Sequence, residues 1–269
     1  MELVTTHTHT NYTGHGHGSV AELVQAASAA GIKTIAVTEH YPLSKEIDPT
    51  NLVSMKHSDV ENYISDIETA AQANQNMNVL CGCELDWLGA DEDRNLAKCD
   101  FSPFDVILGS VHYIDLWAFD NPSLIDKWDE MGKDAVWRRY FEVWCEAASC
   151  KSAPFAIMSH PDIVKKFGYR PSFDPAKLYS QAAEAVQSTG RMVEVNTSGA
   201  TYACKEMYPA PELLREFCRA GIPCTVGTDA HTPADVARGI EDAYKLMWSV
   251  GYKCVTVPTK EGGRTEIPL

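Results

Sequence analysis

Short runs of apolar, β-prone residues alternate along this chain with longer segments in which apolar residues recur every three to four positions. The short runs predict seven strands, at 2–9, 33–40, 78–85, 104–113, 154–162, 191–199 and 222–231. The longer segments predict helices at 19–30, 59–73, 133–149, 175–188, 211–220 and 233–250. Because parallel strands need long crossover connections, the alternation predicts one parallel sheet covered by helices.

Residues typical of helix ends support several of these boundaries. Ser19 and Glu22 have capping-box spacing. Asp174-Pro175 and Thr232-Pro233 are typical of an N-cap followed by proline at the first helical position. Glycines, which favour helix C-termini, stand where four of the predicted helices should end: Gly31, Gly190, Gly221 and Gly251.

Polar side chains stand at the end of six of the seven predicted strands. They are His7, His9, His40, Glu84, His112, His160, Asp229 and His231. An open sheet would spread these strand ends along a line, whereas a closed sheet brings them to one mouth. Barrel enzymes keep their active sites at that mouth, so the pattern favours an α/β barrel.

Taken singly, each of these histidines has an ordinary explanation, as a surface pair or as a hydrogen-bonded residue at a barrel rim. Core histidines placed by chance would not favour one end of nearly every strand. Six or seven imidazoles and two carboxylates are too many ligands for one tetrahedral site. They suit a cluster of two or three divalent ions that share a hydroxide nucleophile. Imidazole ligands favour Zn, Mn or Fe over Mg or Ca.

The net charge of the chain limits the kinds of molecule that such a site is expected to bind. The chain has 269 residues, a formal net charge of −14 and a pI near 5.0. An acidic chain repels nucleic acid and anionic lipid, so nucleic acid is not an expected partner. A small anionic substrate held by metal ions remains compatible with this charge. The sequence leaves the oligomeric state open.

Cysteine usage and the absence of long apolar runs favour a cytoplasmic protein. The nine cysteines are odd in number and form no C-x-x-C pair, which predicts reduced thiols that mostly pack in the core. We find no signal-peptide pattern and no apolar run of about 20 residues, so no membrane partner is expected. We expect a single domain over residues 1–269.

The ordered motifs H-x-H, G-H-x-x-G-[ST], [ED]-H, a lone Glu, G-S-V-H, S-H-P-D and G-T-D-A-H resemble the polymerase-and-histidinol-phosphatase (PHP) family. The resemblance covers nearly the whole chain. The segments "HYIDLWAFDNP", "SHPDIVKKFGYRP" and "EVNTSG…YPAPELL" resemble its histidinol-phosphate phosphatase branch. This resemblance implies a distorted (β/α)7 barrel with three divalent metal ions, Mn, Zn or Fe, at the C-terminal ends of the strands.

The resemblance also assigns ligands to the three ions. One ion would be held by four residues: His7, His9, Glu84 and Asp229. Glu84 would bridge to a second ion that His112 and His160 also hold, and three histidines would hold the third: His15, His40 and His231. In this register His17 is the variable position of the G-H-x-x-G-[ST] motif, so it is not an expected ligand.

The implied reaction is hydrolysis of a small phosphate ester by a metal-bridging hydroxide, with histidinol phosphate as the first substrate candidate. Glu39 and Asp162, beside two of the histidines, are expected to orient a ligand or move protons. Three basic residues after the fifth strand are candidates for binding phosphate: Arg170, Lys165 and Lys166.

One departure from the branch weakens the choice of substrate. The arginine that the resemblance implies shortly after N-T-x-G is missing from "NTSGATYACKEMYP". Lys205 is a candidate substitute, although lysine lacks the bidentate fork. We also expect at least one aromatic of the "LWAFDNP" region to line the substrate pocket, from Trp117, Phe119 and Trp128.

Two other functions stay open. One is a phosphodiesterase or phosphatase that acts on a cyclic sugar phosphate or a nucleotide. The other is a non-catalytic, polymerase-associated module. The acidic charge, the lack of an appended domain and the complete ligand set count against the second.

Overall fold

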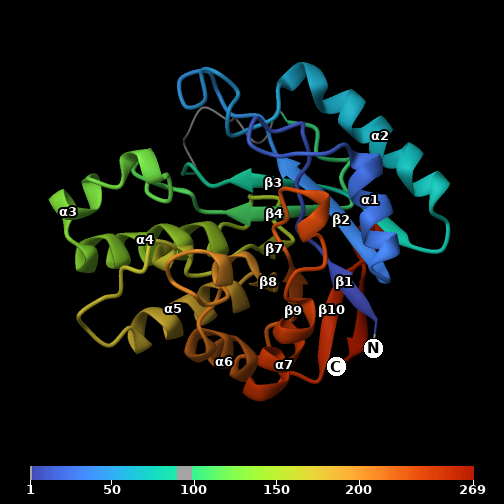
Figure 1. Cartoon of the computed structure of the whole chain (residues 1–269). Helices are drawn as coiled ribbons and strands as arrows, with labels where there is room; N and C mark the ends of the chain where they lie inside the picture. Colours follow the sequence, from blue (N-terminus) through green and yellow to red (C-terminus); the bar gives the residue numbers. More distant parts are fainter. Residues whose placement is uncertain (1, 90–98) are drawn as a thin grey trace.

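The computed structural model describes residues 2–89 and 99–269, and it contains a seven-stranded parallel sheet (Figure 1). The strands follow in the order β1 (Leu3–Thr5), β2 (Ile32–His40), β3 (Asn78–Asp86), β4 (Val106–Ser110), β7 (Ile157–Met158), β8 (Met192–Asn196) and β9 (Cys224–Gly227). Each of the seven overlaps a segment that the sequence predicts as a strand, and β2 and β3 extend one residue beyond theirs.

Backbone hydrogen bonds between the first and last strands close the sheet. The Thr6 amide donates to the Val226 carbonyl at 2.9 Å, and the Asp229 amide donates to the His7 carbonyl at 2.9 Å. The His9 amide donates to the Ala230 carbonyl at 2.8 Å. The prediction of a (β/α)7 barrel is therefore confirmed.

Helices lie around the outside of the barrel (Figure 1). They are α1 (Val20–Ala29), α2 (Val60–Ala73), α3 (Lys127–Met131), α4 (Lys133–Ser149), α5 (Ala176–Gln187), α6 (Pro211–Arg219) and α7 (Ile240–Val250). The predicted capping box of Ser19 and Glu22 starts α1. No helix among the described residues has both the length and the apolar character that a membrane crossing requires.

The barrel interior explains why the polar residues gather at one mouth. A small apolar cluster takes residues from five neighbouring strands: Ala36, Leu80, Val106, Leu108, Ile157 and Met192. Side chains alternate along a strand, so residues two or four positions later point the same way. His40 therefore lies above Ala36, Glu84 above Leu80 and Glu194 above Met192.

The structure differs from the sequence-based expectation in several elements. The structure adds helix α3, a hairpin of β5 (Tyr113–Ile114) and β6 (Trp117–Ala118), and an antiparallel pair of β10 (Cys254–Pro258) and β11 (Arg264–Pro268). The last helix begins at Ile240 rather than Pro233, because Gly239 takes a φ of 75° and interrupts the helix. Thr232-Pro233 instead starts a 3-10 turn over Pro233–Asp235.

Candidate metal centre

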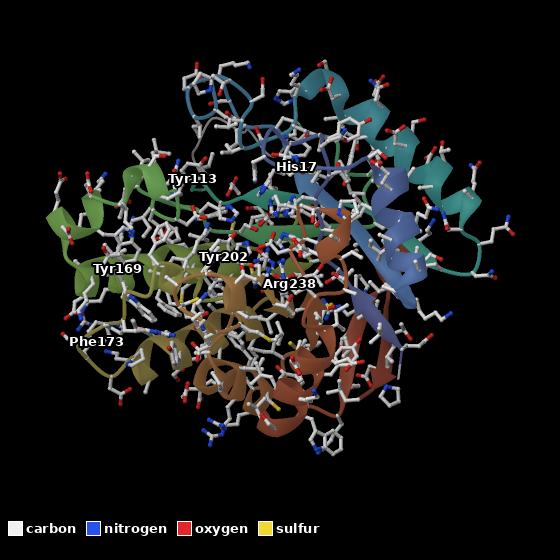
Figure 2. The ribbon with its side chains drawn as sticks, in the orientation of Figure 1. His17, Tyr113, Tyr169, Phe173, Tyr202 and Arg238 are labelled. Atoms are coloured by element: carbon white, nitrogen blue, oxygen red, sulfur yellow. The ribbon has the colours of Figure 1, made fainter. Side chains whose placement is uncertain are left out.

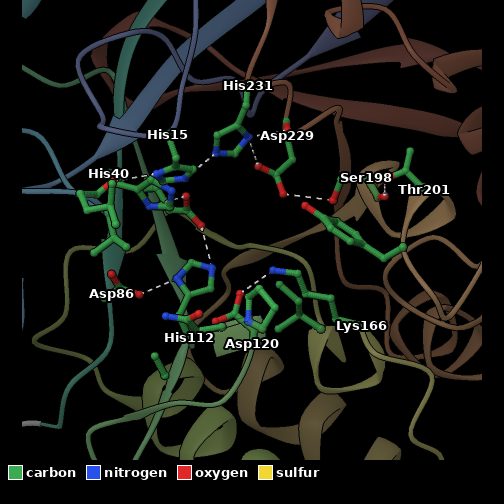
Figure 3. A pocket seen from close by; sticks show the side chains of 18 of the residues that line it. His15, His40, Asp86, His112, Asp120, Lys166, Ser198, Thr201, Asp229 and His231 are labelled. Atoms are coloured by element: carbon green, nitrogen blue, oxygen red, sulfur yellow. Dashed lines mark hydrogen bonds and ion pairs between the residues drawn. The ribbon is translucent and has the colours of Figure 1, made fainter. Parts of the chain in front are cut away.

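The structure brings all nine predicted metal ligands together at the C-terminal mouth of the barrel. Figure 3 shows those that line the cavity, among them His15, His40, His112, Asp229 and His231. They lie around Glu84, whose side chain is only 1% exposed. Five imidazoles have a ring nitrogen within 3.6 Å of its carboxylate: His7, His9, His40, His112 and His160. A carboxylate surrounded in this way is placed to bridge cations.

The remaining ligands form the outer part of the cluster. The Nε2 atoms of His15 and His231 lie 3.0 Å apart. Asp229 Oδ1 lies 3.3 Å from His9 Nε2, and the rings of His9 and His231 stack at 4.2 Å. His9 is thus near both the inner and the outer ligands.

These spacings fit divalent cations. Two ligands bound to one tetrahedral ion at 2.0–2.1 Å are separated by about 3.3 Å. His7 Nε2 and His9 Nε2 are 3.1 Å apart, and both lie 3.1–3.3 Å from Glu84 Oε2. Glu84 Oε2 is buried and has no hydrogen-bond partner among the described residues. A cation would satisfy this oxygen and both nitrogens together.

Three carboxylates contact the Nδ1 atoms of three imidazoles, on the side of each ring behind the cluster, and hold these rings in place. The Nδ1 atoms of the imidazoles lie close to these carboxylates: His7 to Glu194 at 3.0 Å, His9 to Glu39 at 3.3 Å and His112 to Asp86 at 2.6 Å. With Nδ1–H donating to a carboxylate, each Nε2 is free to face the cluster. Glu39 thus contacts His9, which favours ligand orientation over proton transfer for this residue.

Sequence reasoning missed Glu194 and Asp86, although a signal for each was present. Glu194 lies between valines in an apolar strand, where an unpaired carboxylate would be costly. Asp86 follows Glu84 by two residues and so lies on the same face of β3.

Electrostatics divide the histidines into two groups. Burial lowers the pKa of His7, but Glu194, Glu84 and Asp229 outweigh it and raise the pKa to about 10. Burial and Asp86 act in the same opposed way on His112, whose pKa is also raised to about 10. Burial, joined by the charge of His9, lowers the pKa of His231 to about 3. A metal ion bound at His7 or His112 therefore displaces protons.

The carboxylates of the cluster stay ionised. Burial raises the pKa of Glu84, but His7 and His40 outweigh this effect and hold the pKa well below its usual range. Burial and His7 oppose each other in the same way at Asp229, whose pKa is also well below its usual range. Both groups thus present negative charge to a cation.

A cavity of about 590 Å³ opens over the cluster. Lys166 lines it and donates to Asp120 Oδ2 at 2.9 Å (Figure 3). Arg238 lines it as well, paired with Asp235 at 2.8 Å, and Figure 2 shows it near Tyr202. Lys166 is thus the one predicted phosphate-binding residue among the described lining residues, and sequence reasoning missed Arg238.

Lys165 and Asp162 do not reach this cavity. Lys165 is fully buried and donates to Asp162 at 3.0 Å, to Glu206 at 2.8 Å and to the Met207 carbonyl at 2.8 Å. Burial raises the pKa of Asp162 to about 6, and the Ala210 amide also donates to its carboxylate. Asp162, with a φ of 63°, precedes the 3-10 turn Ile163–Lys165 that carries Lys165. Lys165 is therefore an internal cation, not a phosphate ligand.

Arg170 and Lys205 also lie away from the cavity lining that the structure describes. Arg170 pairs with Glu206 at 2.9 Å, on the side of Lys165. Lys205 is exposed, and its ammonium donates to the Thr201 carbonyl at 3.2 Å. Neither residue is placed to replace the missing arginine.

The three aromatic side chains expected at the pocket pack against one another and are not among its described lining residues. Trp117, Phe119 and Trp128 are at most 5% exposed, and their rings meet edge to face with centroids 6.0–6.4 Å apart. Phe119 also contacts Tyr140 of α4. The expectation that one of them lines the pocket is wrong, because all three pack into the core, Trp117 from β6, Phe119 from the residue after β6 and Trp128 from α3.

His17 differs from its three neighbours in "HTHTNYTGHGH". His7 and His9 are buried and His15 lines the cavity, whereas His17, labelled in Figure 2, is exposed and does not belong to the described lining. Its backbone amide donates to the His231 carbonyl at 2.8 Å.

The family model described as the PHP domain matches residues 5–198, well over half of the chain. The chain belongs to the PHP family. This confirms the prediction made from the motifs.

Relatives of this PHP protein are named as phosphatases. A "Probable histidinol-phosphatase" of Deinococcus radiodurans is 33% identical over 94% of this chain and 96% of its own. A "Probable phosphatase" of Acetivibrio thermocellus is 23% identical over 95% of this chain and 90% of its own.

A solved structure shares the fold of this PHP protein. It is histidinol phosphate phosphatase from Lactococcus lactis subsp. lactis, complexed with zinc, L-histidinol and phosphate. The TM-score is 0.77 at 20% identity, over 96% of this chain and 97% of that one. At this identity, the likeness supports the barrel.

Proposed function

We propose that the protein is a metal-dependent phosphomonoesterase of small molecules, with histidinol phosphate as the first substrate candidate. The observation that carries the proposal is Glu84, enclosed by five imidazoles at the base of a cavity. Lys166 and Arg238 line the same cavity. Metal ions at the base of the cavity, together with these two cationic side chains on its wall, would suit a phosphate group.

At the level of reaction class, the protein is an enzyme that hydrolyses phosphate esters with divalent metal ions. Its family, the named relatives and the His/Glu cluster agree on this. The choice of histidinol phosphate as the substrate is the more specific part of the proposal. It is supported by the name of the D. radiodurans relative and by the ligands of the L. lactis enzyme.

We assign three ions to the cluster. His7, His9, Glu84 and Asp229 would hold the first, and Glu84, His112 and His160 the second. His15, His40 and His231 would hold the third. When bound, the ions would supply positive charge for the phosphate oxygens and lower the pKa of water.

The chain's own residues orient both the ligands and the substrate. Glu194, Glu39 and Asp86 fix the ring orientation of three ligands. Asp120 holds Lys166 toward the cavity, where the ammonium would neutralise phosphate. Apolar side chains of the lining, among them Ile163, would contact the organic part of the substrate.

A substrate panel tests this proposal. The manganese-loaded enzyme is assayed for kcat/KM with histidinol phosphate, cyclic sugar phosphates, bis(4-nitrophenyl) phosphate and nucleoside phosphates. We expect histidinol phosphate to give the highest value. The missing arginine after "NTSG" favours the cyclic or nucleotide alternative, which gains if one of those esters exceeds histidinol phosphate by orders of magnitude.

Lys166→Met should lower kcat/KM for the preferred phosphate ester by about 10- to 100-fold. The reason is that a hydrogen bond between charged groups contributes about 1.5–3 kcal/mol. Lys205→Met is the matched control, because its ammonium is exposed and bonds only a carbonyl among the described groups. Equal losses in the two variants would remove Lys166 from the proposed site.

A further inference from the structure

The histidines of the cluster differ in what holds them from behind. Carboxylates hold His7, His9 and His112. Main-chain carbonyls hold two of the remaining four: His15 Nδ1 lies 3.0 Å from the Leu52 carbonyl, and His231 Nδ1 lies 3.0 Å from the Asp229 carbonyl. A carboxylate behind an imidazole increases its basicity and adds negative charge, whereas a carbonyl mainly orients the ring.

Two of the three imidazoles of the proposed third ion, His15 and His231, have the second kind of support, and the nearest carboxylate oxygen to His231 Nδ1 is Asp229 Oδ1 at 3.6 Å. The three imidazoles of this ion bring no carboxylate of their own, while the other two positions share Glu84. Among them only His40 approaches that carboxylate, with Nδ1 3.1 Å from Oε2. Because a divalent cation gains most from anionic ligands, this position offers the smaller electrostatic gain.

Exposure acts in the same direction. His15 is exposed, and the side chain of His231 is 27% exposed. By contrast, His7 and His9 are fully buried and His160 is 1% exposed. Beside solvent, water competes with the protein ligands for the ion, and the ion has an open route out of the site.

The Leu52 carbonyl owes its position to a buried aspartate. Asp48 is 3% exposed, and its carboxylate accepts the Leu52 amide at 2.8 Å, the Val53 amide at 3.1 Å and the Ser54 amide at 3.0 Å. The loop that carries Leu52 also packs closely against Gly14, which precedes His15. A Cβ added to Gly14 would lie 2.8 Å from the Leu52 carbonyl oxygen.

We propose that the ion at His15, His40 and His231 is the exchangeable ion of the centre, and that Asp48 sets its affinity through the Leu52 carbonyl. Asp48 is then a positioning residue, because it acts on the metal through His15. The Thr13 hydroxyl, 3.1 Å from His15 Nδ1, supplies a second contact, so loss of Asp48 weakens the position without abolishing it. The inference rests on the metal-dependent function proposed above.

Manganese content measured against a competing chelator tests the proposal. The full chain is reconstituted with Mn²⁺ and dialysed against rising concentrations of EGTA, and bound manganese is counted by elemental analysis. We expect one equivalent to leave at a chelator concentration at least about tenfold lower than the other two. Simultaneous loss of all ions would overturn the proposal.

Two variants identify which ion leaves first. His15→Ala should lack the early equivalent and keep the two resistant ones. His17→Ala, the matched control, should keep all three equivalents and the early step. Loss of a resistant equivalent in His15→Ala would contradict the assignment.

Asp48→Asn tests the positioning role. The first manganese equivalent should leave at an EGTA concentration about fivefold lower than in the unmodified protein. The concentrations at which the other two leave should not change. Gly14→Ala, which pushes directly on the Leu52 carbonyl, should have the same effect if Asp48→Asn does not fold. An unmoved early step, or an equal shift of all steps, would contradict the role of Asp48.

This readout does not depend on catalysis. Stepwise metal loss from a protein that hydrolyses no phosphate ester would refute the proposed function alone. Full phosphatase activity with simultaneous metal loss would refute the exchangeable ion alone.

Discussion

Replacement of Glu84 by glutamine is expected to lower kcat/KM by about 10³-fold and to reduce the metal content of the protein. Glu84 is the one carboxylate within 3.6 Å of five imidazoles of the cluster in the described structure. Glutamine keeps the shape but removes the negative charge and puts an NH₂ group where a ligand oxygen should be. A 10³-fold loss corresponds to about 4 kcal/mol of transition-state stabilisation.

Glu146→Gln is the matched control for Glu84. Glu146 lies on α4 with a side chain that is 57% exposed, so this variant should retain metal content and activity. Circular dichroism on both variants separates a lost metal centre from a lost fold. Full metal occupancy and near-normal activity in Glu84→Gln would show that the cluster does not carry the reaction.

Glu194→Gln is expected to weaken metal binding by about 10- to 100-fold although Glu194 is not a proposed ligand. Its carboxylate lies behind His7 and also accepts the His160 amide at 2.8 Å, so it orients two ligands at once. The site leaves no room for adjustment, because a Cβ on Gly227 would lie 1.7 Å from Glu194 Oε1. Metal titration of the variant and of the exposed control Glu184→Gln measures the effect.

An unchanged titration of Glu194→Gln would mean that His7 needs no partner behind it. The same experiment distinguishes orientation from folding. A variant that only loses stability should bind metal normally below its melting temperature.

The strand ends were predictable because two independent patterns in the sequence mark them. The seven apolar runs give the barrel, and the side chains that follow them give the mouth. His40 and Glu84, for example, follow apolar residues of the same strand at even spacing, so they share the interior face. The ligand grouping itself came from the family resemblance, because periodicity does not say which imidazoles meet around one ion.

Parts of the cavity wall were not predictable, for identifiable physical reasons. Arg238 lies in a segment of helical pattern, and its place at the cavity depends on Gly239, whose positive φ starts a new helix. The β5–β6 turn puts Asp115 and Leu116 at φ values of 50° and 64°. Leucine rarely adopts this conformation, so the sequence carried no hairpin signal. Trp117, which lies on that hairpin, was misplaced as a result.

Lys165 shows the limit of arguing from charge alone. Two adjacent lysines after the same strand have the same formal charge, yet Lys166 lines the cavity and Lys165 is buried. The partner that separates them, Glu206, lies 41 residues further along the chain. Only the tertiary structure reveals such a pair.

Phosphate release as a function of added metal tests the account most directly. The metal-free protein is titrated with Mn²⁺, and hydrolysis of the best ester of the substrate panel is followed at each addition. We predict negligible activity without metal and a plateau once three equivalents per chain are bound. Full activity in the metal-free protein, or a plateau at one equivalent, would contradict it.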